Sequence, residues 1–333
     1  MSKHRVLSLA LLLLVISFPT VARAQAQARR FERLRPRLEE MVTAFSGTMG
    51  IAVRDISTGD ELSINGDRAF PMASVYKVPI MVEVFRQIDA GKFSLTDRVQ
   101  LTDEERTLGS GVLTLMSSGL NPTIEDLITL MIILSDNEAT DILLKKVGAA
   151  NVTATMRSLG LKDIRVDRTT FELIRDYVAL YDDRVRGKSY KEITALALKR
   201  DLPERIARAD IEFAKVTKDV SSPREMALLF EKIVKGQAAS PASCQKMMTI
   251  LRRQQFNQRL PRYLPERVDS AGMAHKTGTI GSTTNDAGVM FVRGTPVALV
   301  VFTVDKRIAR GEVEEQMGRV ARVVFDFFDY EKK

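Results

Sequence analysis

The sequence of 333 residues contains few of the residues that build disulfides and metal sites. It has one cysteine, Cys244, and two histidines, His4 and His275. A single cysteine excludes an intrachain disulfide, and a zinc site normally needs three or four His, Cys or carboxylate ligands. A Ser-His-Asp triad would depend on His275, because His4 lies in an N-terminal segment that we expect to be removed. We therefore expect no metal and no cofactor, and a nucleophile whose base is not histidine.

Long apolar runs are also scarce. The run VLSLALLLLVISF follows the basic start MSKHR and precedes ARA, which ends at Ala24. This is the three-part pattern of a secretory signal peptide, and the run is shorter than the roughly 20 residues of a membrane span. An uncleaved anchor is the alternative interpretation. We expect residues 1–24 to be removed and the protein to be periplasmic or secreted, with no stable membrane association.

The chain lacks a strong excess of one charge. Removal of the leader takes away Lys3, Arg5 and Arg23 and leaves 47 basic residues against 42 acidic ones, a net charge of +5. The two signs are interspersed, and no basic run lies beside aromatic residues. Nucleic acid is therefore not an expected partner. We expect a solvated surface, a small-molecule substrate and a monomer.

Apolar patterns place strands at both ends of the chain and helices in the middle. GTMGIAVRDISTGDELSING is typical of two strands around the turn STGD, and residues 274–305 are typical of strands with a turn at RGTP. Residues 31–45 and 312–330 are helical in pattern. We predict an α/β fold of the α+β type, with one antiparallel sheet flanked by helices. The sheet domain would comprise residues 25–72 and 221–333, and an inserted all-helical domain residues 73–220.

Ser74 and Lys77 begin an apolar helical pattern and share one face of it. Burial there would lower the lysine pKa, so that a neutral amine could accept a proton. The helix N-terminus would stabilise negative charge developing at Ser74. A second Ser-x-x-Lys, Ser243 and Lys246, lies in a polar stretch without these features. Taken alone, Ser74 could also be a helix cap beside a surface lysine.

Two further short motifs follow in order: SDN at residues 135–137, where a helix breaks, and KTG at residues 276–278, where a strand begins. Each could be a cap or a strand start. The ordered set of three is the signature of class A serine β-lactamases and penicillin-binding proteins. The chain resembles the class A serine β-lactamase family along nearly all its mature length, also in SSPREMALLFEKIVKG, LRRQQ, RLPRYLPE and HKTGTIGSTTNDAGVM.

The resemblance implies a β-lactamase/transpeptidase-like fold and a role for each motif residue. Ser74 would form an acyl-enzyme, Lys77 would accept its proton, and Ser135 would pass a proton to the leaving nitrogen. The substrate would be held by Asn137, Lys276, Thr277, Gly278 and Thr279, with the backbone N–H groups of Ser74 and Thr279 as the oxyanion hole and Arg259 close to the carboxylate pocket.

The sequence departs from the family in one loop. Class A enzymes carry Arg-x-Glu-x-x-x-Asn, whose Glu activates the deacylating water. Here Arg168 matches the arginine, and direct register places Thr170 and Ile174 at the other two positions. A shift of two residues brings Glu172 and Asp176 there instead. We predict Glu172 as the catalytic base, within a loop region 168–220 enlarged by roughly 35 residues relative to the family.

This departure leaves three functions open. With Glu172 in place, the chain would be a β-lactamase that opens the ring and hydrolyses the acyl-enzyme. Without it, the chain would be a penicillin-binding DD-peptidase-like hydrolase with slow deacylation, acting on β-lactams or peptidoglycan peptides. The third possibility is a non-catalytic β-lactam binder.

Overall fold

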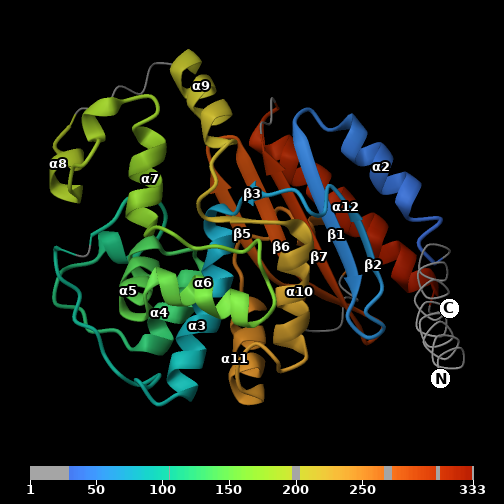
Figure 1. The fold of residues 1–333 in the computed structure, drawn as a ribbon, viewed down its shortest axis with the longest axis horizontal. Coiled ribbons are helices and arrows are strands. Elements are labelled where there is room, and N and C mark those ends of the chain that lie inside the picture. The colour runs from blue at the N-terminus through green and yellow to red at the C-terminus, as the bar shows by residue number, and fades with distance from the viewer. Residues whose placement is uncertain (1–29, 105, 197–202, 266–271, 305–307, 332–333) are drawn as a thin grey trace, which may run out of the picture.

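The computed structural model describes residues 30–104, 106–196, 203–265, 272–304 and 308–331 (Figure 1). The predicted signal peptide, residues 1–24, lies outside the described residues. Within the described ranges, no helix has the length and apolar character needed to cross a membrane.

A five-stranded antiparallel sheet joins the two ends of the chain, as predicted. Its order is β2-β1-β7-β6-β5, and Ile51 of β1 lies opposite Val301 of β7. The turn between β6 and β7 uses Arg293 and Gly294 at φ 47° and 77°, the left-handed region that suits a two-residue hairpin. The strands are β1 (Thr48–Asp55), β2 (Glu61–Ile64), β5 (Ala274–Ile280), β6 (Thr283–Val292) and β7 (Thr295–Val304), and a separate pair is formed by β3 (Phe70–Pro71) and β4 (Val220–Ser221).

Each face of the sheet packs against helices, because the central strand β7 is apolar on both sides. Leu299 and Val301 join the core beneath α2 (Arg35–Ala44) and α12 (Arg310–Glu331). Val300 and Phe302 join the core on the opposite face, which α10 (Pro223–Val234) covers. Figure 1 shows α2 and α12 together on one side of the sheet and α10 on the other.

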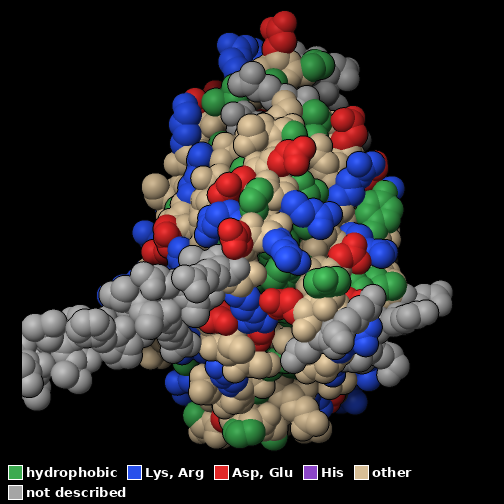
Figure 2. Space-filling view, turned by 90° about the vertical axis from the view of Figure 1, so that its right-hand side faces the viewer, with side chains coloured by type: hydrophobic (Ala, Val, Ile, Leu, Met, Phe, Trp, Pro, Cys, Tyr) green, Lys and Arg blue, Asp and Glu red, His purple; other side chains and the backbone are tan. Residues whose placement is uncertain are grey.

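The outer surface of α2 and α12 carries mixed charge. Figure 2 looks onto this side, where basic and acidic side chains are interspersed. Ion pairs one helical turn apart account for part of the pattern, such as Arg319–Glu315 and Arg322–Asp326 on α12. The side chains of these pairs are exposed to solvent, so the pairs contribute little to stability.

The helical half of the molecule lies beside the face of the sheet that α10 covers (Figure 1). Its central helix, α3, is buried on nearly all sides, including Val78, Met81 and Phe85. At the start of α4, Thr123 and Asp126 form a capping box. The elements are α3 (Lys77–Asp89), α4 (Ile124–Ile133), α5 (Asn137–Val147), α6 (Ala149–Ser158), α11 (Pro241–Leu251) and the 3₁₀ turns η1 (Ala73–Tyr76) and η2 (Leu113–Leu115). A further 3₁₀ turn, η4 (Leu260–Tyr263), packs against α12 instead.

The described parts of the loop region 168–220 form a helical layer of their own, seen at the upper left of Figure 1. It contains α7 (Thr170–Val178), η3 (Asp183–Val185), α8 (Tyr190–Thr194) and α9 (Pro203–Phe213). An ion pair closes its base, since Arg168 Nε lies 2.7 Å from Asp219 Oδ2. Asp219 Oδ1 also accepts a hydrogen bond from Asp167 N at 2.7 Å. The two ends of the segment are therefore held together.

Candidate active site

Ser74 lies in the 3₁₀ turn η1, directly before the α-helix α3 that begins at Lys77. Ala73 has a φ of 47°, which a residue with a side chain seldom adopts, so the backbone is strained next to Ser74. Ser74 is partly exposed and lines a cavity of about 390 Å³. Lys77, one turn later, is completely buried.

The Lys77 ammonium group binds residues of the SDN motif. Its Nζ donates to Asn137 Oδ1 at 2.7 Å, to the Ser135 carbonyl at 2.8 Å and to Ser135 Oγ at 3.2 Å. Burial lowers the pKa of Lys77 to about 7, although the negative charges of Asp136 and Asp141 oppose this change. A substantial neutral fraction therefore exists at neutral pH, as a proton acceptor requires.

The SDN motif turns the chain between α4 and α5. Ser135 has a φ of 55°, and the following Asp136 is the N-cap of α5. The buried Asp136 carboxylate accepts hydrogen bonds from the backbone N–H groups of Val112, Leu113 and Ala139 at 2.7–3.0 Å. This fixed turn presents Ser135 and Asn137 to the cavity.

The KTG motif brings a second buried lysine to the same hydroxyl group. Lys276 Nζ donates to Ser135 Oγ at 3.1 Å and to the Thr277 carbonyl at 2.8 Å. Ser135 Oγ therefore lies between two lysines. Burial and the positive charges of Lys77 and Arg259 hold the pKa of Lys276 well below its usual value. A carboxylate bound beside Lys276 would favour the ammonium form and reverse that change.

Strand β5 approaches η1 so closely that only glycine fits at position 278. A Cβ on Gly278 would lie 2.6 Å from the Met72 carbonyl oxygen and 3.0 Å from Ser74 N. Arg259 fixes the same stretch, because its Nη1 donates to the Gly278 carbonyl at 2.9 Å and its Nη2 to Thr279 Oγ1 at 2.6 Å. Thr277, Gly278, Thr279 and Arg259 all line the cavity.

Glu172 does not reach this cavity. It occupies the third position of α7, where its Oε2 accepts hydrogen bonds from Thr169 N at 2.8 Å and Thr169 Oγ1 at 3.0 Å. The carboxylate thus closes a capping box and satisfies free N–H groups of the helix end. The residues in direct register, Thr170 and Ile174, line the cavity instead. The expected two-residue shift is therefore absent, because α7 is a regular helix from its first turn.

The wall formed by α7 carries no base among its described cavity-lining residues, which are Thr170, Leu173 and Ile174. Thr170 Oγ1 lies 2.7 Å from Tyr76 OH, and Thr170 N donates to Asp141 Oδ1 at 2.6 Å. Burial raises the pKa of Asp141. No local sequence pattern identifies Asp141 or Tyr76 as residues of the site. Through their contacts with Thr170, both hold the start of α7 in place.

Glu314 is the one acid among the described residues that line the cavity. Its Oε1 pairs with Arg259 Nη2 at 3.2 Å, on the β5 side of the cavity. The carboxylate is therefore occupied by the Arg259 guanidinium group.

Other candidates from the sequence lie elsewhere and have structural contacts. Ser243 Oγ donates to Asp89 Oδ1 at 2.7 Å, and Lys246 pairs with Glu125 at 2.8 Å. His275 is buried beside Asp286, with 2.9 Å between His275 Nδ1 and Asp286 Oδ1. None of these lines the cavity.

The site thus combines a cavity-lining serine in a strained turn with two fully buried lysines that donate to one hydroxyl group, Ser135 Oγ. Residues 33–328 match the β-lactamase enzyme family. The chain belongs to this family. Family membership and the α+β fold with its antiparallel sheet are therefore as predicted from the sequence.

The family relatives cover most of the chain at low identity. The β-lactamase VEB-1 of Pseudomonas aeruginosa is 24% identical over 329 residues, 96% of this chain and 97% of the relative. A β-lactamase of Streptomyces albus G is 28% identical and covers 80% of this chain and 76% of its own length. Among solved structures, the β-lactamase from Sphaerobacter thermophilus is 29% identical with a TM-score of 0.70, covering 88% and 96% of the two chains. An ancestral class A β-lactamase is 26% identical with a TM-score of 0.71, covering 88% and 99%.

Proposed function

We propose that the protein is a serine β-lactamase-like hydrolase that opens the β-lactam ring through an acyl-enzyme on Ser74. The observation that carries this proposal is the buried Lys77, whose pKa of about 7 suits a proton acceptor, one turn from Ser74 in the same site as Ser135 and Lys276. The N-terminal leader pattern supports export to the periplasm or the medium.

Acylation uses groups that already lie together. Ser74 Oγ attacks the β-lactam carbonyl carbon and its proton passes to neutral Lys77. The oxyanion is stabilised by the N–H groups of Ser74 and Thr279. When the C–N bond breaks, the ring nitrogen takes a proton from Ser135 Oγ, which Lys77 replaces across 3.2 Å. Lys276 and Arg259 attract the substrate carboxylate.

Deacylation requires a water molecule to attack the ester while a base accepts its proton and Ser74 Oγ regains one. The α7 wall offers Thr170, Leu173 and Ile174, while the Glu172 carboxylate faces Thr169. These contacts favour a second candidate function, a DD-peptidase-like acylase whose acyl-enzyme decays slowly. Lys77, whose pKa burial lowers to about 7, is then the candidate base for the hydrolytic step.

Intact-mass spectrometry over time with penicillin G tests both candidates. The wild type should gain the mass of one whole β-lactam, and Ser74→Ala should gain none. Ser243→Ala is the matched control, because Ser243 begins the second Ser-x-x-Lys and bonds Asp89 outside the cavity. An adduct that disappears with product release supports the β-lactamase, and an adduct that persists for hours supports the second candidate. Labelling that survives Ser74→Ala contradicts both.

A further inference from the structure

A second cavity, of about 580 Å³, lies between α7, the segment after η3 and the segment that follows α9. It shares no lining residue with the cavity at Ser74. Five basic residues line it: Arg168, Arg175, Arg186, Lys215 and Lys218. All five belong to the loop region 168–220.

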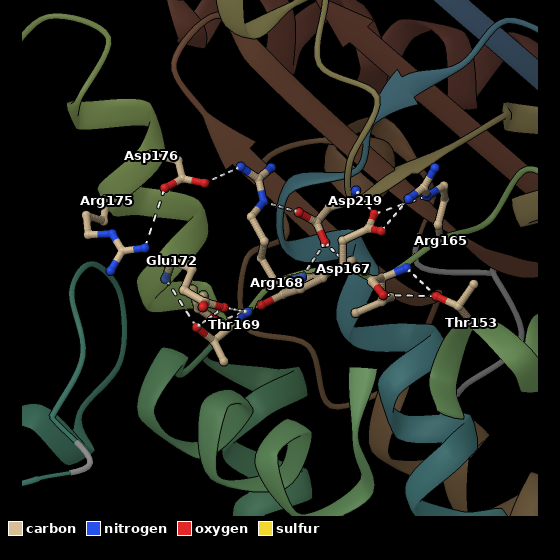
Figure 3. A network of polar contacts seen from close by, with 12 residues as sticks. Thr153, Arg165, Asp167, Arg168, Thr169, Glu172, Arg175, Asp176 and Asp219 are labelled. Atoms are coloured by element: carbon tan, nitrogen blue, oxygen red, sulfur yellow. Dashed lines mark hydrogen bonds and ion pairs between the residues drawn. The ribbon is translucent and has the colours of Figure 1, made fainter. Parts of the chain in front are cut away.

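Nearby carboxylates balance these charges only in part. Asp176 is the one acid among the described lining residues, and its Oδ2 lies 2.9 Å from Arg168 Nη1 (Figure 3). Asp219 pairs with Arg168 Nε, and Glu212 pairs with Lys215 at 2.7 Å. These three carboxylates are fewer than the five cations that line the cavity, so the cavity has an excess of positive charge that attracts anions.

Arg168 also has an unused donor. The residue is only 8% exposed, and its Nη2 is buried without a hydrogen-bond partner among the described residues. The other two guanidinium nitrogens bind Asp176 and Asp219, as Figure 3 shows. A buried donor without an acceptor is unfavourable, and an anionic oxygen in the cavity would satisfy it.

The remaining lining is apolar. Leu180, Phe213 and Val216 face the same space as the cations, and Leu180 is 43% exposed. An inorganic ion would leave these side chains uncovered and most of the volume empty. A cavity of this size with an apolar surface and a few charged groups suits a small organic ligand.

We propose that this cavity is a binding site for an organic anion, with the acidic group at Arg168, Arg186 and Lys218 and an apolar body against Leu180 and Phe213. The site is separate from the acylation chemistry. It is connected to it through α7, because Arg175 and Asp176 line this cavity while Thr170 and Ile174 line the other. A bound anion would therefore stabilise the α7 wall of the active site.

The probe is 8-anilinonaphthalene-1-sulfonate, which joins a sulfonate to an aromatic body, titrated by calorimetry and by fluorescence. The test variant is Arg186→Ala/Lys218→Ala, and the matched control is Lys188→Ala/Lys191→Ala. The control removes the same charge from the same loop region, but neither of its residues lines the cavity. We expect one probe to bind each wild-type and control molecule, and the test variant to bind about tenfold more weakly or worse for each cation lost.

Rising sodium chloride should weaken binding to the wild type, because screening acts on the cationic cavity. The titrations are repeated on Ser74→Ala, so that the result does not depend on the proposed acylation. Equal affinity of the two double variants, or no stoichiometric binding by the wild type, would overturn the proposal. If the probe instead bound at Lys276 in the Ser74 cavity, the two double variants would have equal affinities for it, and this result would also overturn the proposal. Thermal unfolding of both variants checks that each is folded.

Discussion

The two walls of the Ser74 cavity differ in how strongly packing fixes the residues that would take part in the reaction. The first wall comes from η1, the start of α5 and strand β5. It presents Ser74 and Ser135 to the cavity, while the fully buried Lys77 and Lys276 donate to Ser135 Oγ. The second is the helix α7 of the loop region 168–220, which presents Thr170, Leu173 and Ile174. The first wall has the groups for acylation, and the second lacks a group that could activate water.

The contacts explain this difference. On the first wall, Gly278 lies against the backbone of Ser74 and both lysines are fully buried, so a changed residue would disturb the core. On the second wall, the hydrogen bond from Thr170 N to Asp141 and the Arg168–Asp219 pair hold the ends of the segment, and the Thr170 side chain adds a contact with Tyr76 OH. The residues that we propose for acylation are therefore fixed by the core, whereas the residues that would face the deacylating water come from one helix, α7.

The largest expected effect is that of Lys77→Arg. Arginine keeps the positive charge but cannot give up its proton, so the acceptor is lost. We expect acylation of Ser74 to slow by about 10²–10⁴, the usual contribution of a general base. Lys276→Arg is the comparison variant and should weaken substrate binding by only about tenfold, since a cation remains near the carboxylate. Stopped-flow acylation rates with nitrocefin would measure both, and equal losses would contradict the separate roles.

A carboxylate added to the second wall should have the next largest effect. Thr170→Glu places an acid on a residue that lines the cavity, and we expect deacylation to accelerate by about 10–10², below the full value of a general base. The gain is limited because Asp141 already brings negative charge to the start of α7. Thr170→Gln is the control of equal size without a base. Decay of the penicillin adduct measures the rate, and an equal rate in the two variants would show that the second wall does not limit turnover.

The same contrast explains what could be predicted from the sequence. The hairpins, the helix caps and the three motifs depend on local patterns, so the sheet and the residues of the first wall were predicted. The position of Ser135 Oγ between two lysines joins segments 58 and 141 residues apart, which no local pattern reports. The placement of Glu172 was wrong for a different reason. Thr169-x-x-Glu172 is itself a capping-box pattern, and that local preference outweighed the similarity to the family loop.

The pH dependence of acylation should give a smaller effect. Burial lowers the Lys77 pKa to about 7, so the neutral acceptor is the minor form below that pH and the major form above it. From pH 6 to pH 8 the neutral fraction rises from about one tenth to about nine tenths, so the acylation rate should rise roughly tenfold. Single-turnover rates of the wild type would show a midpoint close to 7. A rate that is flat over this range, or falls with rising pH, would contradict proton acceptance by Lys77.

The smallest expected effect is that of Glu172→Gln, and it bears directly on the second wall. The Glu172 carboxylate accepts hydrogen bonds from Thr169, and glutamine can take the same place in a capping box. We expect the deacylation rate to change by less than about threefold, against about 10²–10⁴ for loss of a general base. The unfolding free energy should fall by no more than about 1 kcal/mol, as for a modified helix cap. Adduct decay and thermal unfolding of Glu172→Gln measure the two quantities. A deacylation rate slowed by two orders of magnitude, with the fold intact, would mean that α7 turns this carboxylate toward the ester once Ser74 is acylated, and the two walls would then share the chemistry.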